Sequence, residues 1–143
     1  DLTGKGDGTF YVRGNVYNGA NTSAWQTTSD RRIKKNIVDN TTGLDKINQI
    51  RVRNFEYRTP DEIDYTEFVE GTNPKSIPIN KEGVQLGVIA QEIEKVLPDI
   101  VETETTGVKT VNPDNLTWYL INAIKELSAE KTALKARLDA AGL

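Results

Sequence analysis

The hydrophobic positions near the end of the chain form the clearest pattern in the sequence. They follow a seven-residue repeat made up of Leu120, Ile124, Leu127, Leu134 and Leu138. Asn112 can cap a helix with Pro113 at its first position, and no helix breaker follows before residue 141. The spacing therefore predicts one long helix over residues 112–141.

The repeat gives this helix the features of a coiled coil. With the leucines at d positions, the a positions are Thr117, Ile124, Lys131 and Leu138. Glu130 at g and Lys135 at the following e could pair between parallel chains. A helix lying on the surface of its own domain explains the first two turns equally well. We expect a parallel coiled coil, because the chain from Glu126 onward has little else to pack against.

Shorter apolar patterns predict a small mixed domain before the long helix. The predicted elements are helices over residues 44–50 and 90–97, strands over residues 52–57 and 84–89, and a hairpin of residues 100–102 and 108–111. Residues 59–82 hold three prolines and an acidic stretch, which is typical of a long loop or insertion. The expected fold class is α+β.

The first part of the chain has a different composition. Residues 1–28 are rich in Gly, Asn, Thr and Ser, and two short strands are predicted over residues 9–13 and 15–17. Such thin strands bury little alone and suit the end of an elongated β-structured fibre. Because the chain begins at Asp1 and not at methionine, we expect it to be part of a longer protein.

Composition narrows the choice of partners and cofactors. The 143 residues have room for one domain, or for a small domain with an appended element. The net charge is −3 and the one basic run is Arg31 to Lys35, so nucleic acid is not an expected partner. No apolar run reaches the ~18 residues of a membrane span, and no membrane partner is expected. Histidine and cysteine are both absent, so we expect no disulfide, no metal site and no cofactor.

The same absences limit the possible catalytic groups. Neither a Ser-His-Asp triad nor a thiol nucleophile can be assembled within one chain, so a serine activated by lysine is the natural alternative. Ser29 is followed five positions later by Lys34, in the segment Ser29 to Val38. A turn followed by a solvated edge strand is the simpler interpretation of these residues.

Three sequence blocks resemble a known family. Residues 29–37 resemble the opening of a self-cleaving intramolecular chaperone domain, residues 87–98 resemble its second signature, and residues 119–127 resemble its third. The blocks occur in the family's order. The chain is therefore similar to the endosialidase-type chaperone peptidases at the C-terminus of phage tail spikes and tail fibres. Residues 59–82 match nothing in that family.

The resemblance implies a homotrimer with a single-turnover peptidase activity. The chaperone part would bring three chains together, let the preceding fibre or spike fold in cis, and then cut itself off at the Ser29–Asp30 junction. Residues 1–29 would be the end of the fibre in the virion tail. Residues 30–143 would be the chaperone, released into the host cytoplasm, with its helix over residues 112–141 holding the trimer.

The implied catalytic residues are Ser29 and Lys34. Supporting residues are expected among Arg32, Asn36, Gln91 and Glu92. A lysine with its ordinary pKa of about 10.4 is protonated at neutral pH, whereas burial and nearby positive charge lower the pKa of a lysine. We therefore expect cleavage to wait until assembly buries the site.

Three routes to cleavage stay open. Attack by Ser29 on its own carbonyl is not among them, because it would form a strained four-membered ring. Attack on the Thr28–Ser29 bond forms a five-membered ring, and attack by the Asp30 carboxylate on the Ser29 carbonyl forms a six-membered ring. A serine from a neighbouring chain is the third route.

Two other functions fit parts of the sequence. One is a non-cleaving trimeric fibre tip that binds a host receptor, with Tyr65 and Phe68 of the 59–82 loop as the contact surface. The other is the same module in a cellular membrane-tethered transcription factor. The Gly- and Asn-rich stretch before Ser29 favours a fibre over a DNA-binding domain.

Overall fold

The structure is a computed structural model that describes residue 19 and residues 27–143. The chain divides into two compact units, residues 1–39 and residues 40–143. The short strands predicted over residues 9–13 and 15–17 lie outside the described residues.

The described part of the first unit contains a single turn of 3-10 helix, Arg31–Ile33. The Asp30 side chain caps this turn by accepting a hydrogen bond from the Arg32 backbone N–H at 2.8 Å. The Lys34 N–H donates to the Arg31 carbonyl at 3.1 Å, and the chain then returns to an extended conformation. Asp and Asn are favoured at such caps because a short side-chain oxygen satisfies a backbone N–H that the turn leaves without a partner.

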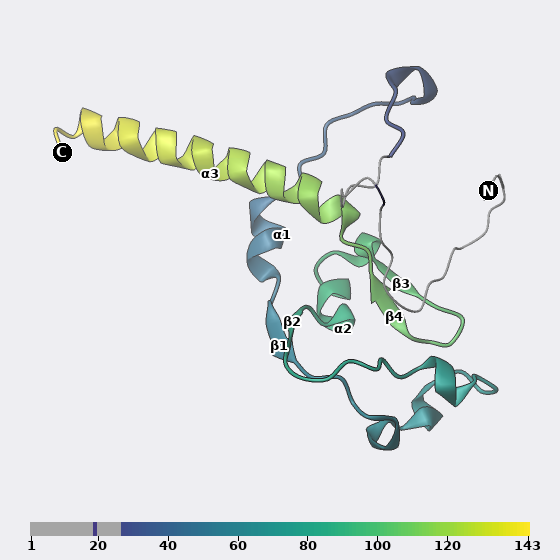
Figure 1. The fold of residues 1–143 in the computed structure, drawn as a ribbon. Helices are drawn as coiled ribbons and strands as arrows, with labels where there is room; N and C mark the ends of the chain where they lie inside the picture. Colours follow the sequence, from purple (N-terminus) through teal and green to yellow (C-terminus); the bar gives the residue numbers. More distant parts are fainter. Residues whose placement is uncertain (1–18, 20–26) are drawn as a thin grey trace. The chain divides into compact units, whose positions relative to one another are not determined.

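The second unit mixes helices and sheets, as the predicted α+β class requires. Its elements are α1 (Leu44–Gln49), β1 (Arg53–Phe55), β2 (Gln85–Gly87), α2 (Ala90–Glu94), β3 (Val101–Thr103), β4 (Lys109–Val111) and α3 (Asp114–Ala140). Strand β1 pairs antiparallel with β2, and β3 pairs antiparallel with β4, which gives two small sheets (Figure 1).

The core of this unit forms around α2 and the turn that follows it. Ile93, Leu97 and Ile100 are each at most 3% exposed. Partly buried side chains surround them, namely Ile50, Val88, Val96, Val101, Val111, Leu116 and Tyr119. The helix ends at Glu94, three residues before the predicted end, because Pro98 restricts the residues that precede it.

The predicted hairpin of residues 100–111 is confirmed with one correction. Strands β3 and β4 are joined by a tight turn in which the Gly107 N–H donates to the Glu104 carbonyl at 2.9 Å. Gly107 has φ 88°, a conformation that glycine adopts without a steric cost. Ile100 was expected in the first strand, but it ends a 3-10 turn begun by Pro98 and enters the core.

The predicted strand of residues 52–57 is present but shorter. Alternation places Arg53 and Phe55 on the less exposed face of β1, whereas Val52 is 67% exposed. An arginine occupies the inner face because it forms an ion pair there with Glu92 of α2.

The loop predicted over residues 59–82 contains no α-helix or strand. It is folded by three 3-10 turns, Pro60–Glu62, Tyr65–Glu67 and Pro74–Ser76. The Val69 N–H donates to the Thr106 carbonyl at 3.1 Å, which attaches the loop to the turn between β3 and β4.

Helix α3 agrees closely with its prediction. It begins at Asp114, and the Asn112 side chain accepts a hydrogen bond from the Asp114 N–H at 3.0 Å. The cap position is therefore Pro113, one residue later than the predicted cap, Asn112. None of the described helices, α3 included, is long and apolar enough to cross a membrane.

Candidate functional site

The structure brings Ser29 and Lys34 together within the first unit. The Lys34 Nζ lies 2.5 Å from the Ser29 Oγ, and both residues are exposed. The 3-10 turn between them reverses the chain enough for a lysine five residues away to reach back to the serine. The pair that the sequence predicts as catalytic is therefore in direct hydrogen-bonding contact.

A second contact in the same turn joins Asp30 to Arg32. The Arg32 Nε lies 3.0 and 3.1 Å from the two carboxylate oxygens of Asp30, and one terminal nitrogen lies 2.6 Å from Oδ2. Hydrogen bonds from the Arg32 side chain and backbone hold the pKa of Asp30 below its usual value, and the carboxylate raises the pKa of Arg32. Arg32 was expected as a supporting residue, and this fork between Arg32 and Asp30 was not predicted, although an Asp two residues before an Arg at a turn is a signal for it.

Asn36 lies two residues after Lys34, at a bend of the backbone. Its φ of 53° is in the left-handed region, where asparagine is tolerated better than most residues. The structure thus assigns Asn36 a conformational role in turning the chain after the basic run. Any part in cleavage stays a prediction.

Gln91 and Glu92 belong to the second unit, in the first turn of α2. Glu92 accepts hydrogen bonds from Arg53 at 2.6 and 3.1 Å, and Arg51 lies 3.8 Å away. The hydrogen bond with Arg53 is the main reason that the pKa of Glu92 is lowered. Glu92 therefore joins α2 to β1, while Gln91 is exposed beside it. Their contact with the cleavage site stays a prediction.

Helix α3 is partly covered by its own unit and partly exposed. Leu116 and Tyr119 pack against the core around α2, and Ala123 is only 3% exposed. The heptad residues lie beside these side chains on the helix surface, with exposures of 42% for Leu120, 65% for Ile124, 51% for Leu127, 54% for Leu134 and 42% for Leu138. We call these five heptad residues the seam of the predicted coiled coil, and they are largely uncovered in the single chain.

Polar contacts anchor the start of α3 to α1. The Glu126 Oε2 accepts a hydrogen bond from the Leu44 N–H at 2.8 Å, so a side chain of α3 caps α1. The Asn122 side chain donates to the carbonyls of Asn40 and Thr42 at 3.1 and 2.9 Å. A Cβ at Gly43 would lie 2.8 Å from Glu126 Oε1 and 3.1 Å from the Ala123 nitrogen, so glycine permits this close approach. These contacts join residues about 80 positions apart, and the sequence pattern does not predict them.

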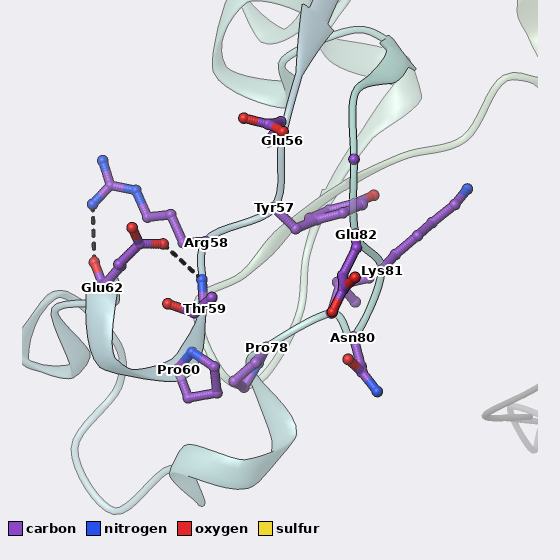
Figure 2. Close-up of a pocket in the computed structure, with 12 residues that line it drawn as sticks. Glu56, Tyr57, Arg58, Thr59, Pro60, Glu62, Pro78, Asn80, Lys81 and Glu82 are labelled. Atoms are coloured by element: carbon purple, nitrogen blue, oxygen red, sulfur yellow. Dashed lines mark hydrogen bonds between the residues drawn. The ribbon is translucent and has the colours of Figure 1, made fainter.

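A pocket of about 570 Å³ lies where the two ends of the 59–82 loop meet (Figure 2). It is lined by residues 56–60, Glu62 and residues 78–83. Figure 2 shows Arg58 donating to the Glu62 carbonyl, at 3.2 Å, and the Thr59 N–H donating to the Glu62 carboxylate, at 2.9 Å. These contacts hold one wall of the pocket.

Comparison with known proteins identifies the class of protein to which this fold and site belong. Residues 29–102 match the model of a peptidase family described as "chaperone of endosialidase". The chain belongs to this family. The match begins at Ser29 and contains the first two blocks that carried the resemblance, and the third block lies beyond it.

Two relatives are long tail fibre proteins of bacteriophages. The chain is 32% identical to the long tail fiber protein Gp37 of Enterobacteria phage Ox2, over 90% of the chain and 45% of that protein. It is 31% identical to Gp37 of Enterobacteria phage M1, over 92% of the chain and 47% of that protein. The chain spans less than half the length of these relatives.

Proposed function

We propose that this chain is the intramolecular chaperone of a phage tail fibre and that it removes itself by cutting between Ser29 and Asp30. Three chains assemble through α3, the attached fibre folds, and the chaperone of residues 30–143 is then released. Residues 1–29 stay with the fibre in the virion tail, and the released part stays in the host cytoplasm. Membership of the family and the tail fibre relatives support this proposal.

The observation that carries the peptidase step is the contact between Lys34 and Ser29. A serine hydroxyl is a weak nucleophile until a neighbouring base takes its proton, and the Lys34 Nζ lies 2.5 Å from the Ser29 Oγ. This distance is within the reach that a general base needs. The pair also lies beside the bond that the family resemblance marks for cleavage.

The cleavage consumes one water. The neutral amine of Lys34 takes the proton of the Ser29 hydroxyl, whose oxygen attacks a carbonyl carbon. The resulting ammonium returns the proton to the amide nitrogen of Asp30 as the C–N bond breaks. Water then hydrolyses the ester, which leaves a carboxyl group on Ser29 and an amine on Asp30.

The attacked carbonyl is that of Ser29 in a neighbouring chain of the trimer. Attack on the same chain's Ser29 carbonyl would form a four-membered ring, and Arg32 engages both oxygens of the Asp30 carboxylate. In mixed trimers, a tagged Lys34→Ala chain should therefore be cut by its wild-type neighbours. If the tagged chain stays intact beside wild-type chains that are cut, the attack occurs within one chain.

Trimer formation is supported by the uncovered seam of α3. The five apolar heptad side chains are between 42% and 65% exposed, and burying apolar surface between helices is the main force that forms a coiled coil. Cutting the chain afterwards removes the covalent link between fibre and chaperone. A fibre that unfolds can then no longer be refolded with help, so its stability becomes kinetic.

Intact mass measurement with N-terminal sequencing tests the peptidase step. The wild-type chain should give fragments of residues 1–29 and 30–143, the second beginning at Asp30. Ser29→Ala and Lys34→Ala should stay at full length while remaining trimeric. Lys34→Arg should also stay uncut, since arginine is too strong a base to be neutral.

The control for these variants is Lys35→Ala, which removes the same charge one residue away and should be cut normally. Cleavage that persists in both Ser29→Ala and Lys34→Ala would contradict the assignment of the pair. Fragments that begin at Ser29 would instead indicate attack on the preceding bond.

A second candidate function is a fibre tip that stays attached and binds a receptor. The pocket at the base of the 59–82 loop favours it, since Tyr57, Pro60 and Pro78 line a concave surface there. Tyr65 and Phe68, the expected contact residues, are partly buried, and the Tyr65 hydroxyl donates to the Pro60 carbonyl at 3.0 Å. A wild-type chain that stays at full length and binds host cells would support this function.

A further inference from the structure

We infer that Arg32 is a positioning residue that holds the Asp30 carboxylate, and that an aspartate directly after the scissile bond therefore speeds cleavage. This inference rests on the proposed cleavage between Ser29 and Asp30. It adds a role for the residue on the far side of that bond, in addition to the Ser29 and Lys34 pair.

The geometry of the contact is the first argument. Arg32 approaches Asp30 with three nitrogens, since its backbone N–H donates to Oδ1 at 2.8 Å, its Nε lies near both oxygens, and a terminal nitrogen lies 2.6 Å from Oδ2. A planar guanidinium that engages both carboxylate oxygens fixes orientation as well as distance. Asp30 contributes the amide nitrogen of the scissile bond, so holding its side chain also restrains that peptide group.

The second argument is the position of the contact within the turn. The Asp30 carboxylate caps the turn Arg31–Ile33, and this turn sets the direction in which Lys34 leaves. Ser29 and Lys34 are both exposed, so the local turn is what holds their side chains together within the first unit. Without the Arg32 side chain, the carboxylate would be held by the backbone N–H of residue 32 alone, and the side chains of Ser29 and Lys34 would separate more often.

The third argument concerns the chemistry of the carboxylate itself. A free Asp30 carboxylate could attack the Ser29 carbonyl through a six-membered ring. Arg32 occupies both oxygens of the carboxylate, with Nε 3.0 Å from Oδ1 and a terminal nitrogen 2.6 Å from Oδ2. The fork therefore directs Asp30 toward positioning and away from acting as the nucleophile.

Cleavage rates of paired variants test this role. Arg32→Ala and Asp30→Asn should each be cut more slowly than wild type, on the order of tenfold, because small misplacements of reacting groups have effects of this size or larger. The cleavage rate of Arg32→Lys should lie between the rates of wild type and Arg32→Ala, since a lysine donates from one point only. The double variant Asp30→Asn/Arg32→Ala should be no slower than either single variant, because both changes remove the same contact.

The matched control is Arg31→Ala, which removes an adjacent positive charge that forms no part of the fork and should be cut at the wild-type rate. Millimolar guanidinium chloride should speed the cutting of Arg32→Ala and leave Asp30→Asn/Arg32→Ala unchanged. A general loss of folding would not respond in this way. All variants should remain trimeric by light scattering.

Two results would overturn the inference, and they are distinguishable. Wild type cut after Ser29 with Arg32→Ala cut equally fast would remove the role of Arg32 and leave the proposed function intact. A wild-type chain that stays whole under all conditions would remove the proposed function and this inference with it.

Discussion

The two halves of α3 have different surroundings although they belong to one continuous helix. Residues 114–126 lie against α1 and the core, and Ala123 is buried among them. Residues 127–143 are exposed throughout, and Figure 1 shows this half extending beyond the rest of the second unit. The surface-helix interpretation is thus confirmed for the first half, and the coiled coil stays a prediction that the exposed second half supports.

This difference shows how one helix can link folding to assembly. In the first half, Leu116 and Tyr119 pack on the chain's own core and Ala123 is buried, whereas Leu120 and Ile124 are exposed. A chain whose core is not formed would not hold this first half in place. We therefore expect the seam to be presented correctly only after the second unit has folded.

The largest effect on assembly and cleavage should come from placing charge on the seam. Leu120→Asp combined with Leu127→Asp would bury carboxylates between helices, which costs several kcal/mol for each site that stays ionised. The expected result is a monomer by light scattering, together with loss of cleavage.

The control for this change is Ala129→Asp with Ala136→Asp, which places the same charges at f positions away from the seam and should leave the trimer intact. A trimer that survives the leucine changes would mean that the second half of α3 does not join the chains.

A moderate loss of stability should come from a change where the first half of α3, residues 114–126, packs against α1. Gly43→Ala would place a methyl group 2.8 Å from Glu126 Oε1 and 3.1 Å from the Ala123 nitrogen. Overpacking of this kind costs about 1–3 kcal/mol. Urea unfolding of the chain should show this loss in the second unit, with α3 of the folded chains still able to form trimers. An unchanged free energy of unfolding would mean that α1 and α3 separate easily.

The smallest effect should come from the ion pair between Glu92 and Arg53. The folded-state pKa of Glu92 is lowered, so this pair stabilises the fold above the usual glutamate pKa and is lost as the pH falls through the lowered value. The free energy of unfolding should therefore fall with decreasing pH below about 4.5, the usual value for glutamate. Glu92→Gln should show a shallower fall in the same range, measured by urea unfolding at several pH values. Equal slopes in the two proteins would contradict this contribution.

Much of the fold could be predicted because it depends on local signals. Helix α3 has no breaker between Asp114 and Ala140, and the hairpin of β3 and β4 turns at Gly107. The seven-residue repeat consists of residues that are exposed in the single chain, and their packing in a coiled coil stays a prediction. These features depend on residues that are close together in the sequence.

The contacts that the sequence did not reveal depend on tertiary structure. Glu126 caps α1 across 82 positions of the chain, and Arg53 pairs with Glu92 across 39. Such pairs form only when the core brings their elements together, and nothing in their spacing marks them. The fork of Asp30 and Arg32 is local by contrast, since only two positions separate the residues, and it could have been predicted from the sequence.

The central claim is that cleavage follows assembly, and parallel time courses test it most directly. Trimer formation would be followed by light scattering and cleavage by mass spectrometry, at several pH values, for wild type and for Leu120→Asp/Leu127→Asp. The account predicts that wild-type cleavage begins only after trimers appear and speeds up as rising pH leaves more lysine neutral. It also predicts that the leucine variant is not cut at any pH. Cleavage at the full rate in that variant, measured while it is monomeric, would contradict the account.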